Sequence, residues 1–246
     1  MGNPKPNHSG VYIDGEWRTG GSKMIESTNP ADVTEVVATV QKGGLEDARD
    51  AIDAAERAQA TWRDLSAHDR GAYLHDTADV IEERFADLSQ LVSREMGKTL
   101  DASRGELQRT VDLLNYYAEV ARDAGGIAPP SSSDNTITYT ALEPMGTVSI
   151  ITPWNYPIAI PTWKIAPALA AGNSIVWKPA TLTPEIGRKL IECVEAANLP
   201  DGVINFLTGS GKELGEPLTT HDSVDAVSFT GSTNVGKRVY KNATEH

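Results

Sequence analysis

Four short apolar runs, placed at similar intervals in the second half of the sequence, constrain the fold more than any other feature. They span residues 148–151, 174–177, 203–207 and 226–229. Helix-like segments lie between them: the first ends at Gly172, and the next opens with Thr183 as capping residue and Pro184 in the first turn. Strand and helix in repeated succession imply right-handed crossovers and a parallel sheet covered on both faces. We therefore predict an α/β fold with a doubly wound parallel sheet over residues 146–246.

The first 145 residues have a different pattern. Two short strands over residues 11–18 flank Asp14-Gly15, which is a typical two-residue hairpin turn. From Leu45 to about Arg122, apolar residues recur at three- and four-residue spacing, which predicts amphipathic helices. A connector rich in proline and serine then leads into residues 135–142, whose alternation of apolar and polar side chains predicts an exposed strand. We expect three parts: a hairpin and helices over residues 1–130, a strand and connector over 131–145, and the α/β part over 146–246.

Composition narrows the classes of partner. The chain has 246 residues and a formal net charge of −12, so nucleic acid and anionic membranes are poor electrostatic partners. A small or neutral partner fits better. The acidity is compatible with an ordinary solvated surface and with adaptation to a salty cytoplasm. The first ten residues lack the apolar core of a signal peptide, and no apolar run is long enough to span a membrane, so we expect a cytoplasmic protein.

Cysteine and histidine offer little chemistry. The sole cysteine, Cys193, lies in a helical stretch beside its apolar face with no histidine nearby, so core packing is expected rather than reactivity. The five histidines do not have metal-ligand spacing, and we expect no metal site.

The loops that follow the four predicted strands carry the candidate chemistry. In open parallel sheets, ligands bind beyond the carboxyl ends of the strands. These loops offer the amide of Asn155, the cation of Lys178, several glycines and several hydroxyls, which suit a ligand with phosphates, ribose hydroxyls and a reactive carbonyl. Each piece alone has an ordinary alternative: residues 209–215 fit a plain glycine turn, Lys178 a surface lysine, and Asn155 a helix cap.

The run PWNYPIAIPTWKIAPALAAGNSIVWKPATLTP, followed by FTGSTNVGK, resembles the aldehyde dehydrogenase superfamily. The similarity extends from the hairpin at residues 12–17 to the last residues. The resemblance implies a cofactor domain, a catalytic domain and a small oligomerisation element, and oxidation of an aldehyde to a carboxylic acid with NAD or NADP through a thiohemiacetal and a thioester. Residues 1–130 and 146–246 would then supply most of the cofactor domain and residues 131–145 the oligomerisation strand. The catalytic domain is expected to be absent from this chain.

The resemblance also implies roles for single residues. Asn155 resembles the donor that stabilises the oxyanion formed when a thiolate attacks the aldehyde. The positions that resemble cofactor contacts are Ile151, Thr152, Pro153 and Trp154 along the wall, Lys178 at the ribose, Gly211 and Gly215 at the adenine and pyrophosphate, Phe229, Thr230, Gly231 and Ser232 in the turn facing the diphosphate, and Val235 packing nearby.

Thr181 departs from the family pattern. Relatives that prefer NAD often carry a glutamate three residues after this lysine, where it binds the ribose hydroxyls. A threonine removes a charge that would repel a 2′-phosphate, so we expect that NADP+ is tolerated.

The family's nucleophilic cysteine and general-base glutamate follow the G-S-T-x-x-G motif, beyond His246. We therefore expect the N-terminal portion of an NAD(P)-dependent aldehyde dehydrogenase, inactive alone and a homo-oligomer when complete. Residues 159–165 look similar to relatives that act on semialdehydes. The alternative is a non-catalytic nucleotide-binding or assembly module, or one half of a split enzyme that needs a separate C-terminal half.

Overall fold

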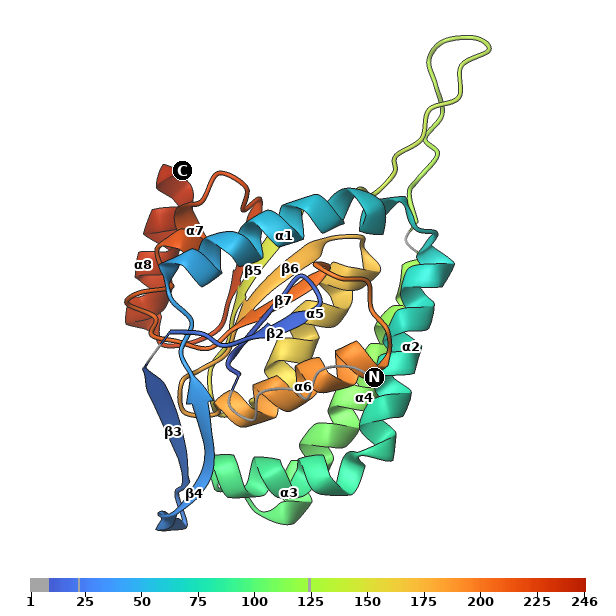
Figure 1. The fold of residues 1–246 in the computed structure, drawn as a ribbon. Helices are drawn as coiled ribbons and strands as arrows, with labels where there is room; N and C mark the ends of the chain where they lie inside the picture. The colour runs from blue at the N-terminus through green and yellow to red at the C-terminus, as the bar shows by residue number, and fades with distance from the viewer. Residues whose placement is uncertain (1–8, 22, 124) are drawn as a thin grey trace.

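The computed structural model describes residues 9–21, 23–123 and 125–246. Its centre is a six-stranded sheet with the order β2-β1-β7-β6-β5-β8. The four predicted parallel strands are present as β5 (Thr147–Ile151), β6 (Ser174–Lys178), β7 (Ile204–Leu207) and β8 (Ala226–Phe229). The doubly wound α/β fold predicted from the sequence is therefore confirmed (Figure 1).

The N-terminal hairpin belongs to the same sheet. Its strands are β1 (Val11–Ile13) and β2 (Glu16–Arg18), joined by Asp14 and Gly15, both at positive φ as a tight hairpin turn requires. The strand β1 pairs antiparallel with β7, with Val11 opposite Leu207. The hairpin thus closes one edge of the parallel sheet, which leaves β8 at the other edge. A second, two-stranded sheet of β3 (Met24–Asn29) and β4 (Asp32–Gln41) lies outside it.

Helices cover both faces of the six-stranded sheet (Figure 1). One face carries α1 (Leu45–Asp64), with α7 (Pro217–Thr220) and α8 (Thr233–Glu245) beside it. The other carries α5 (Ala159–Ala170) and α6 (Pro184–Ala196). Behind these two helices lies an outer layer of α2 (Ala67–Glu83), α3 (Phe85–Met96) and α4 (Leu100–Arg122). The helices predicted between residues 45 and 122 are therefore present. Among the described residues, no helix is both long and apolar enough to cross a membrane.

Each face of the sheet has its own apolar core. Ile150, Trp177 and Phe206 point toward α5 and α6, and the rings of Trp177 and Phe206 lie 5.1 Å apart. Val176 and Leu207 point the other way, toward α1. Successive side chains of a strand face opposite sides of the sheet, so strands this apolar on both sides must be covered on both. Burial of each such side chain contributes roughly 1.5–3 kcal/mol.

Buried glutamates cap the N-termini of α5 and α6. Thr183 occupies the N-cap position of α6, with Pro184 in the first turn, as predicted. Its side chain does not cap the helix, because the Thr183 hydroxyl is buried without a hydrogen-bond partner among the described residues. Glu95, from the end of α3, accepts hydrogen bonds from the backbone N–H groups of Glu185 (2.9 Å) and Ile186 (2.8 Å) instead. Burial raises the pKa of Glu95 to about 7. A carboxylate from a distant part of the chain therefore replaces a local capping side chain.

The segment between α4 and β5 projects from the body as a long arm, drawn in yellow-green (Figure 1). Ile137, Tyr139 and Leu142 are exposed along it, as predicted. The predicted strand over residues 135–142 is not formed in this chain: the arm's described backbone is extended, with one backbone hydrogen bond across it, from Thr140 N to Ile127 O (2.9 Å). A single pair of segments without a partner strand or a packed face rarely forms a stable ladder. The division at residues 131 and 145 stays a prediction.

Candidate functional site

A cleft of about 590 Å³ opens at the carboxyl ends of β5 and β6. Ile151 and Lys178, the last residues of these strands, lie opposite each other in the register. The strands β6 and β7 lie on one side of β5 and β8 on the other, so the chain changes direction at this point of the sheet, where ligands bind in such folds. The lining consists of Ile151, Lys178, Gly211, Lys212, Gly215, Glu216, Thr220, Val235, Arg238, Val239, Asn242, Glu245 and His246. Five residues predicted as cofactor contacts, Ile151, Lys178, Gly211, Gly215 and Val235, thus come together in one cleft.

Lys178 is a buried cation in this lining. Lys178 is only 5% exposed, and its Nζ donates a hydrogen bond to the carbonyl of Pro179 at 2.9 Å. No carboxylate of the described residues forms an ion pair with it. Burial lowers the pKa of Lys178 to about 8. A charge held in a protein without a counter-ion is costly, and this pattern is typical of a site that receives an anionic ligand.

Two further cations line the cleft and were missed by the sequence analysis. Lys212 follows Gly211 in the glycine-rich loop, and Arg238 lies one turn after Val235 on α8. The helical spacing of Arg238 from Val235 was the signal that could have found it. Glu216 and Glu245 also line the cleft, so its charge is mixed. The lining thus contains three cations and two carboxylates in a chain of net charge −12. This local excess of positive charge favours an anionic group such as a phosphate.

Glycine is required where the cleft loop closes. A Cβ atom built on Gly215 would lie 2.4 Å from the carbonyl oxygen of Gly211, which is closer than atoms can approach. Any other residue at position 215 would therefore push these two turns of backbone apart. The result is bare backbone along one wall of the cleft, where a ligand can approach closely.

The turn after β8 adjoins the cleft without lining it. Phe229 pairs with Ile151, and Thr230 N donates to Ile151 O at 3.0 Å. Ser232 caps α8 by accepting from the N–H of Val235 (3.4 Å), and Gly231 lies between them. The turn thus directs the N-terminus of α8, with its free N–H groups, to the same edge of the sheet.

The loop after β5 spreads its predicted residues apart. The Thr152 hydroxyl faces the core, where it accepts from the Trp177 Nε1–H at 2.9 Å. Pro153 is half-buried, and Trp154 lies in a different hollow beside Glu95. Thr152, Pro153 and Trp154 are therefore outside the described cleft, and their role at a cofactor stays a prediction.

Asn155 is exposed at the middle of this loop. Its backbone carbonyl accepts from Lys98 Nζ at 3.2 Å, whereas its side-chain amide makes no hydrogen bond within the described chain. It does not cap α5, because the first N–H groups of that helix bind the carboxylate of Glu106. The amide is thus free to donate to a ligand.

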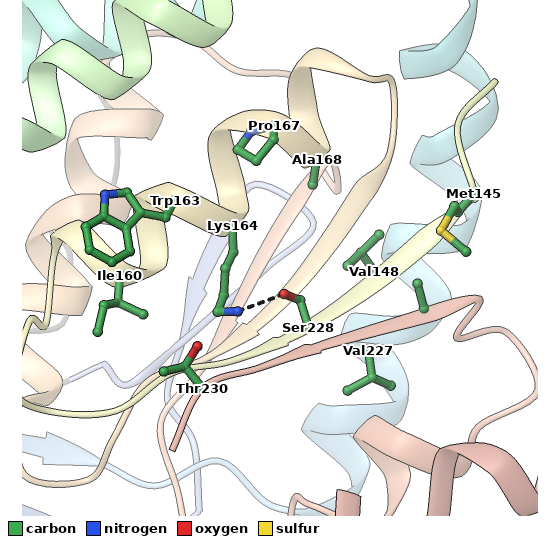
Figure 2. A pocket seen from close by; sticks show the side chains of 11 residues that line it. Met145, Val148, Ile160, Trp163, Lys164, Pro167, Ala168, Val227, Ser228 and Thr230 are labelled. Atoms are coloured by element: carbon green, nitrogen blue, oxygen red, sulfur yellow. Dashed lines mark hydrogen bonds between the residues drawn. The ribbon is translucent and has the colours of Figure 1, made fainter. Parts of the chain in front are cut away.

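A second hollow, of about 410 Å³, lies on the opposite face of the sheet, between α5 and β8. Figure 2 shows Lys164 reaching from α5 to Ser228, with 2.9 Å between Nζ and Oγ. Trp163 and Thr230 also line it, and the other walls are mostly apolar. Burial lowers the pKa of Lys164. The sequence analysis missed this lysine, although a single cation in an otherwise apolar helix was a usable signal.

The other predicted residues lie apart from the cleft. Thr181 is on the exposed turn between β6 and α6 and does not line it. Cys193 is fully buried, and burial raises the pKa of its thiol to about 11, which disfavours the reactive thiolate. Over the part of the chain that the structure describes, no group of three or more His, Cys, Asp or Glu could hold a metal ion.

Sequence comparison finds close relatives. The model of the "Aldehyde dehydrogenase family" matches residues 17–246. The chain is 45% identical over 227 residues to "Alpha-ketoglutaric semialdehyde dehydrogenase" of Bacillus subtilis (strain 168), covering 92% of this chain and 46% of that protein. It is 43% identical over 235 residues to "Alpha-ketoglutarate semialdehyde dehydrogenase" of Haloferax volcanii, covering 95% and 49%. The chain therefore spans about half the length of the curated relatives it matches.

Solved structures agree with these relatives. Betaine aldehyde dehydrogenase from Staphylococcus aureus, solved in complex with NAD+, is 38% identical with a TM-score of 0.93, covering 98% of this chain and 48% of that one. An NADP-dependent enzyme of E. coli is 35% identical with a TM-score of 0.93, covering 97% and 50%. The fold described above is thus shared with enzymes that use either dinucleotide.

Replacing Lys178 tests whether its burial is costly. Lys178→Met should raise the free energy of unfolding at pH 7 by about 1–3 kcal/mol, because it removes a buried charge without a counter-ion. Burial lowers the folded-state pKa of Lys178 from 10.5 to about 8. As the pH rises from 8 toward 10.5, the folded wild type loses this proton before the unfolded chain does, so its stability increases and the gain from methionine should shrink.

Urea unfolding at pH 7 and pH 10 measures this difference. Lys212→Met, on the exposed rim of the same cleft, is the matched control and should change stability little at either pH. A Lys178→Met variant less stable than the wild type at pH 7 would contradict the prediction.

Proposed function

Because this chain belongs to the aldehyde dehydrogenase family, we propose that it forms the cofactor-binding half of an enzyme that oxidises a small-molecule aldehyde to a carboxylic acid with NAD+ or NADP+. The observation that carries the proposal is the cleft at the ends of β5 and β6, where the Lys178 cation, the bare backbone at Gly211 and Gly215 and the side of α8 meet. The cofactor would supply the hydride acceptor.

The residues of the cleft suit a dinucleotide. The Lys178 ammonium can bind a ribose or phosphate oxygen, and Gly215 lets the backbone approach the adenine and pyrophosphate. The turn of Phe229, Thr230, Gly231 and Ser232 presents the N-terminus of α8, whose N–H groups and dipole favour a diphosphate. No metal ion is needed for these contacts.

Asn155 is the residue proposed to act on the substrate. When a thiolate adds to an aldehyde, the carbonyl oxygen becomes an anion, and an N–H donor held in place stabilises the transition state. The free side-chain amide of Asn155 can supply that donor. Cys193 cannot supply the thiolate, because it is buried with a raised pKa. In this proposal the thiolate is supplied by a cysteine outside these 246 residues.

The cleft, together with the burial of Cys193, also supports a second candidate function. A chain that binds NAD+ but has no accessible cysteine would be a nucleotide-binding or assembly module, or half of a split enzyme that needs a separate C-terminal half. Aldehyde-dependent formation of NADH or NADPH by the purified chain would overturn the expectation that it is inactive alone. Purification of the native protein with a cysteine-containing partner would favour the split enzyme.

Semialdehydes are the proposed substrates. The support is the similarity to alpha-ketoglutarate semialdehyde dehydrogenases, which extends over nearly the whole of this chain. A panel of semialdehydes, aliphatic aldehydes and betaine aldehyde, assayed with an enzyme that contains this chain, tests the choice.

A cytoplasmic location fits such an enzyme, since the sole cysteine cannot form an intrachain disulfide.

Removing the donor of Asn155 tests its role. In an enzyme that joins this chain to the C-terminal half of the Bacillus subtilis relative, Asn155→Ala should lower kcat about 10²–10³-fold, as loss of an oxyanion donor does elsewhere. Asn155→Asp, which has the same size but no N–H donor, should lower it at least as much. The Kd for NAD+ should not change in either variant. Wild-type kcat in both variants would exclude the proposed role.

Cofactor choice depends on Thr181 in this proposal. The wild-type chain should bind NADP+ and NAD+ with Kd values within about tenfold of each other, since no carboxylate at position 181 repels a 2′-phosphate. Thr181→Glu should weaken NADP+ binding at least about tenfold while keeping NAD+ binding, and the uncharged Thr181→Gln is the control. Calorimetric titration measures both constants. Unchanged discrimination in Thr181→Glu would count against this role.

The projecting arm is proposed to pair with a second copy of the chain. Its exposed Ile137, Tyr139 and Leu142, and its described backbone, which forms one backbone hydrogen bond across the arm, are suited to adding a strand to a neighbouring sheet. We expect the chain to be an oligomer by light scattering and the double variant Ile137→Asp/Tyr139→Asp to be a monomer with an unchanged Kd for NAD+. A monomeric wild type would contradict this proposal.

A further inference from the structure

A buried ion pair outside the parallel sheet contacts the loop that carries Asn155. Lys98 lies between α3 and α4, and Glu106 lies in the second turn of α4. The Lys98 Nζ and Glu106 Oε2 atoms are 2.5 Å apart, and the two side chains are 10% and 0% exposed. An ion pair so well shielded from water costs much to desolvate, so it requires further hydrogen bonds to the remaining atoms.

Both members make those further contacts with the same loop. The other carboxylate oxygen of Glu106, Oε1, accepts from the backbone N–H groups of Ile158 (3.0 Å) and Ala159 (3.1 Å), where α5 begins. Lys98 Nζ donates to the Asn155 carbonyl at 3.2 Å. It also lies 4.1 Å from the ring centroid of Tyr156, in a cation–π contact. The pair thus holds four of the five residues from 155 to 159.

We infer that Lys98 and Glu106 are positioning residues for Asn155. An amide stabilises an oxyanion only if it is already fixed when the charge forms. The Asn155 side chain makes no hydrogen bond within the described chain, so its direction depends on its backbone. The ion pair contacts that backbone at the Asn155 carbonyl and contacts the residues that follow, Tyr156, Ile158 and Ala159. Pro153 and Pro157 restrict the backbone angles of the loop, but they lack N–H groups and donate no hydrogen bond that would hold it. The inference rests on the proposed role of Asn155.

The chain offers a matched control in Glu95. This residue is equally buried and caps α6 as Glu106 caps α5, through two backbone N–H groups. No described lysine or arginine pairs with it, and α6 does not follow the Asn155 loop. Glu95→Gln therefore removes a buried capping carboxyl from the start of a different helix, and Glu95 makes no hydrogen bond to residues 155–159 in the described chain.

Hydrogen exchange on the 246-residue chain tests the contacts directly. In Glu106→Gln we expect the amide protons of Ile158 and Ala159 to exchange about tenfold faster, since a neutral acceptor is weaker and Lys98 loses its partner. Glu95→Gln should accelerate Glu185 and Ile186 and leave Ile158 unchanged. Lys98→Met, which keeps the carboxylate, is the second variant and should also loosen the loop. Unchanged exchange at Ile158 and Ala159 in both Glu106→Gln and Lys98→Met would overturn the inference.

Catalysis in the enzyme completed with the Bacillus subtilis C-terminal half separates positioning from mere stability. Glu106→Gln and Lys98→Met should lower kcat at least about tenfold while the KM for NAD+ stays the same, because the cofactor cleft is on the other face of the sheet. Glu95→Gln should lower thermal stability with kcat unchanged. If Asn155→Ala lowers kcat but Glu106→Gln and Lys98→Met do not, the positioning inference fails and the proposed function stands. If Asn155→Ala has no effect, the oxyanion role fails and this inference fails with it.

Discussion

Two buried glutamates, Glu106 and Glu95, hold the starts of α5 and α6, the two helices that cover one face of the sheet. A helix begins with N–H groups that have no partner inside the helix, and burying them unpaired is costly. The loops before α5 and α6 provide no side-chain cap, so the outer helices supply one. The outer helices α3 and α4 therefore hold the start of each crossover helix through these glutamates. They also hold the end of the loop that leads from the strand into that helix.

The two faces of the sheet divide the chemistry at its carboxyl edge. The Lys178 cleft faces α7 and α8, whereas Lys164 lies in the hollow between α5 and β8 on the other side. The loop after β5 leads from the edge of the sheet to α5 and carries Asn155 at its middle. Strand β5 is central because the chain continues to β6 on one side and returns to β8 on the other. The buried Lys178 cation lies at this edge without an ion-pair partner among the described residues, a pattern typical of binding sites.

Much of the fold could be predicted because its signals are local. Apolar runs bounded by glycine and proline identified the four parallel strands, and spacing identified the helices. The cleft residues found in advance lie at strand ends, as Lys178 does at the end of β6, or in the loops that follow, as Gly215 does after β7. The misses are contacts between distant residues: Glu106 lies 52 residues before Ile158, and Glu95 lies 91 before Ile186. A threonine before a proline predicts a capping side chain from the local sequence alone. The local sequence could not show that Glu95, from α3, binds the N–H groups of α6 in place of Thr183. Arg238 and Lys164 belong to helices whose orientation only packing decides.

The Lys98–Glu106 pair also bears on how the chain is divided. A boundary placed between residues 130 and 146 separates α4 from α5 in the sequence, yet these two helices pack together. Glu106 of α4, which pairs with Lys98, also accepts two hydrogen bonds from the start of α5. A sheet built from residues 146–246 alone would leave the start of α5 without its Glu106 cap. It would also expose the face of α5 that packs against α4. The hairpin strand β1, paired to β7, ties the first residues to the same sheet. The N-terminal helices therefore pack in one unit with the sheet rather than as a domain beside it, and they contact the loop that carries Asn155.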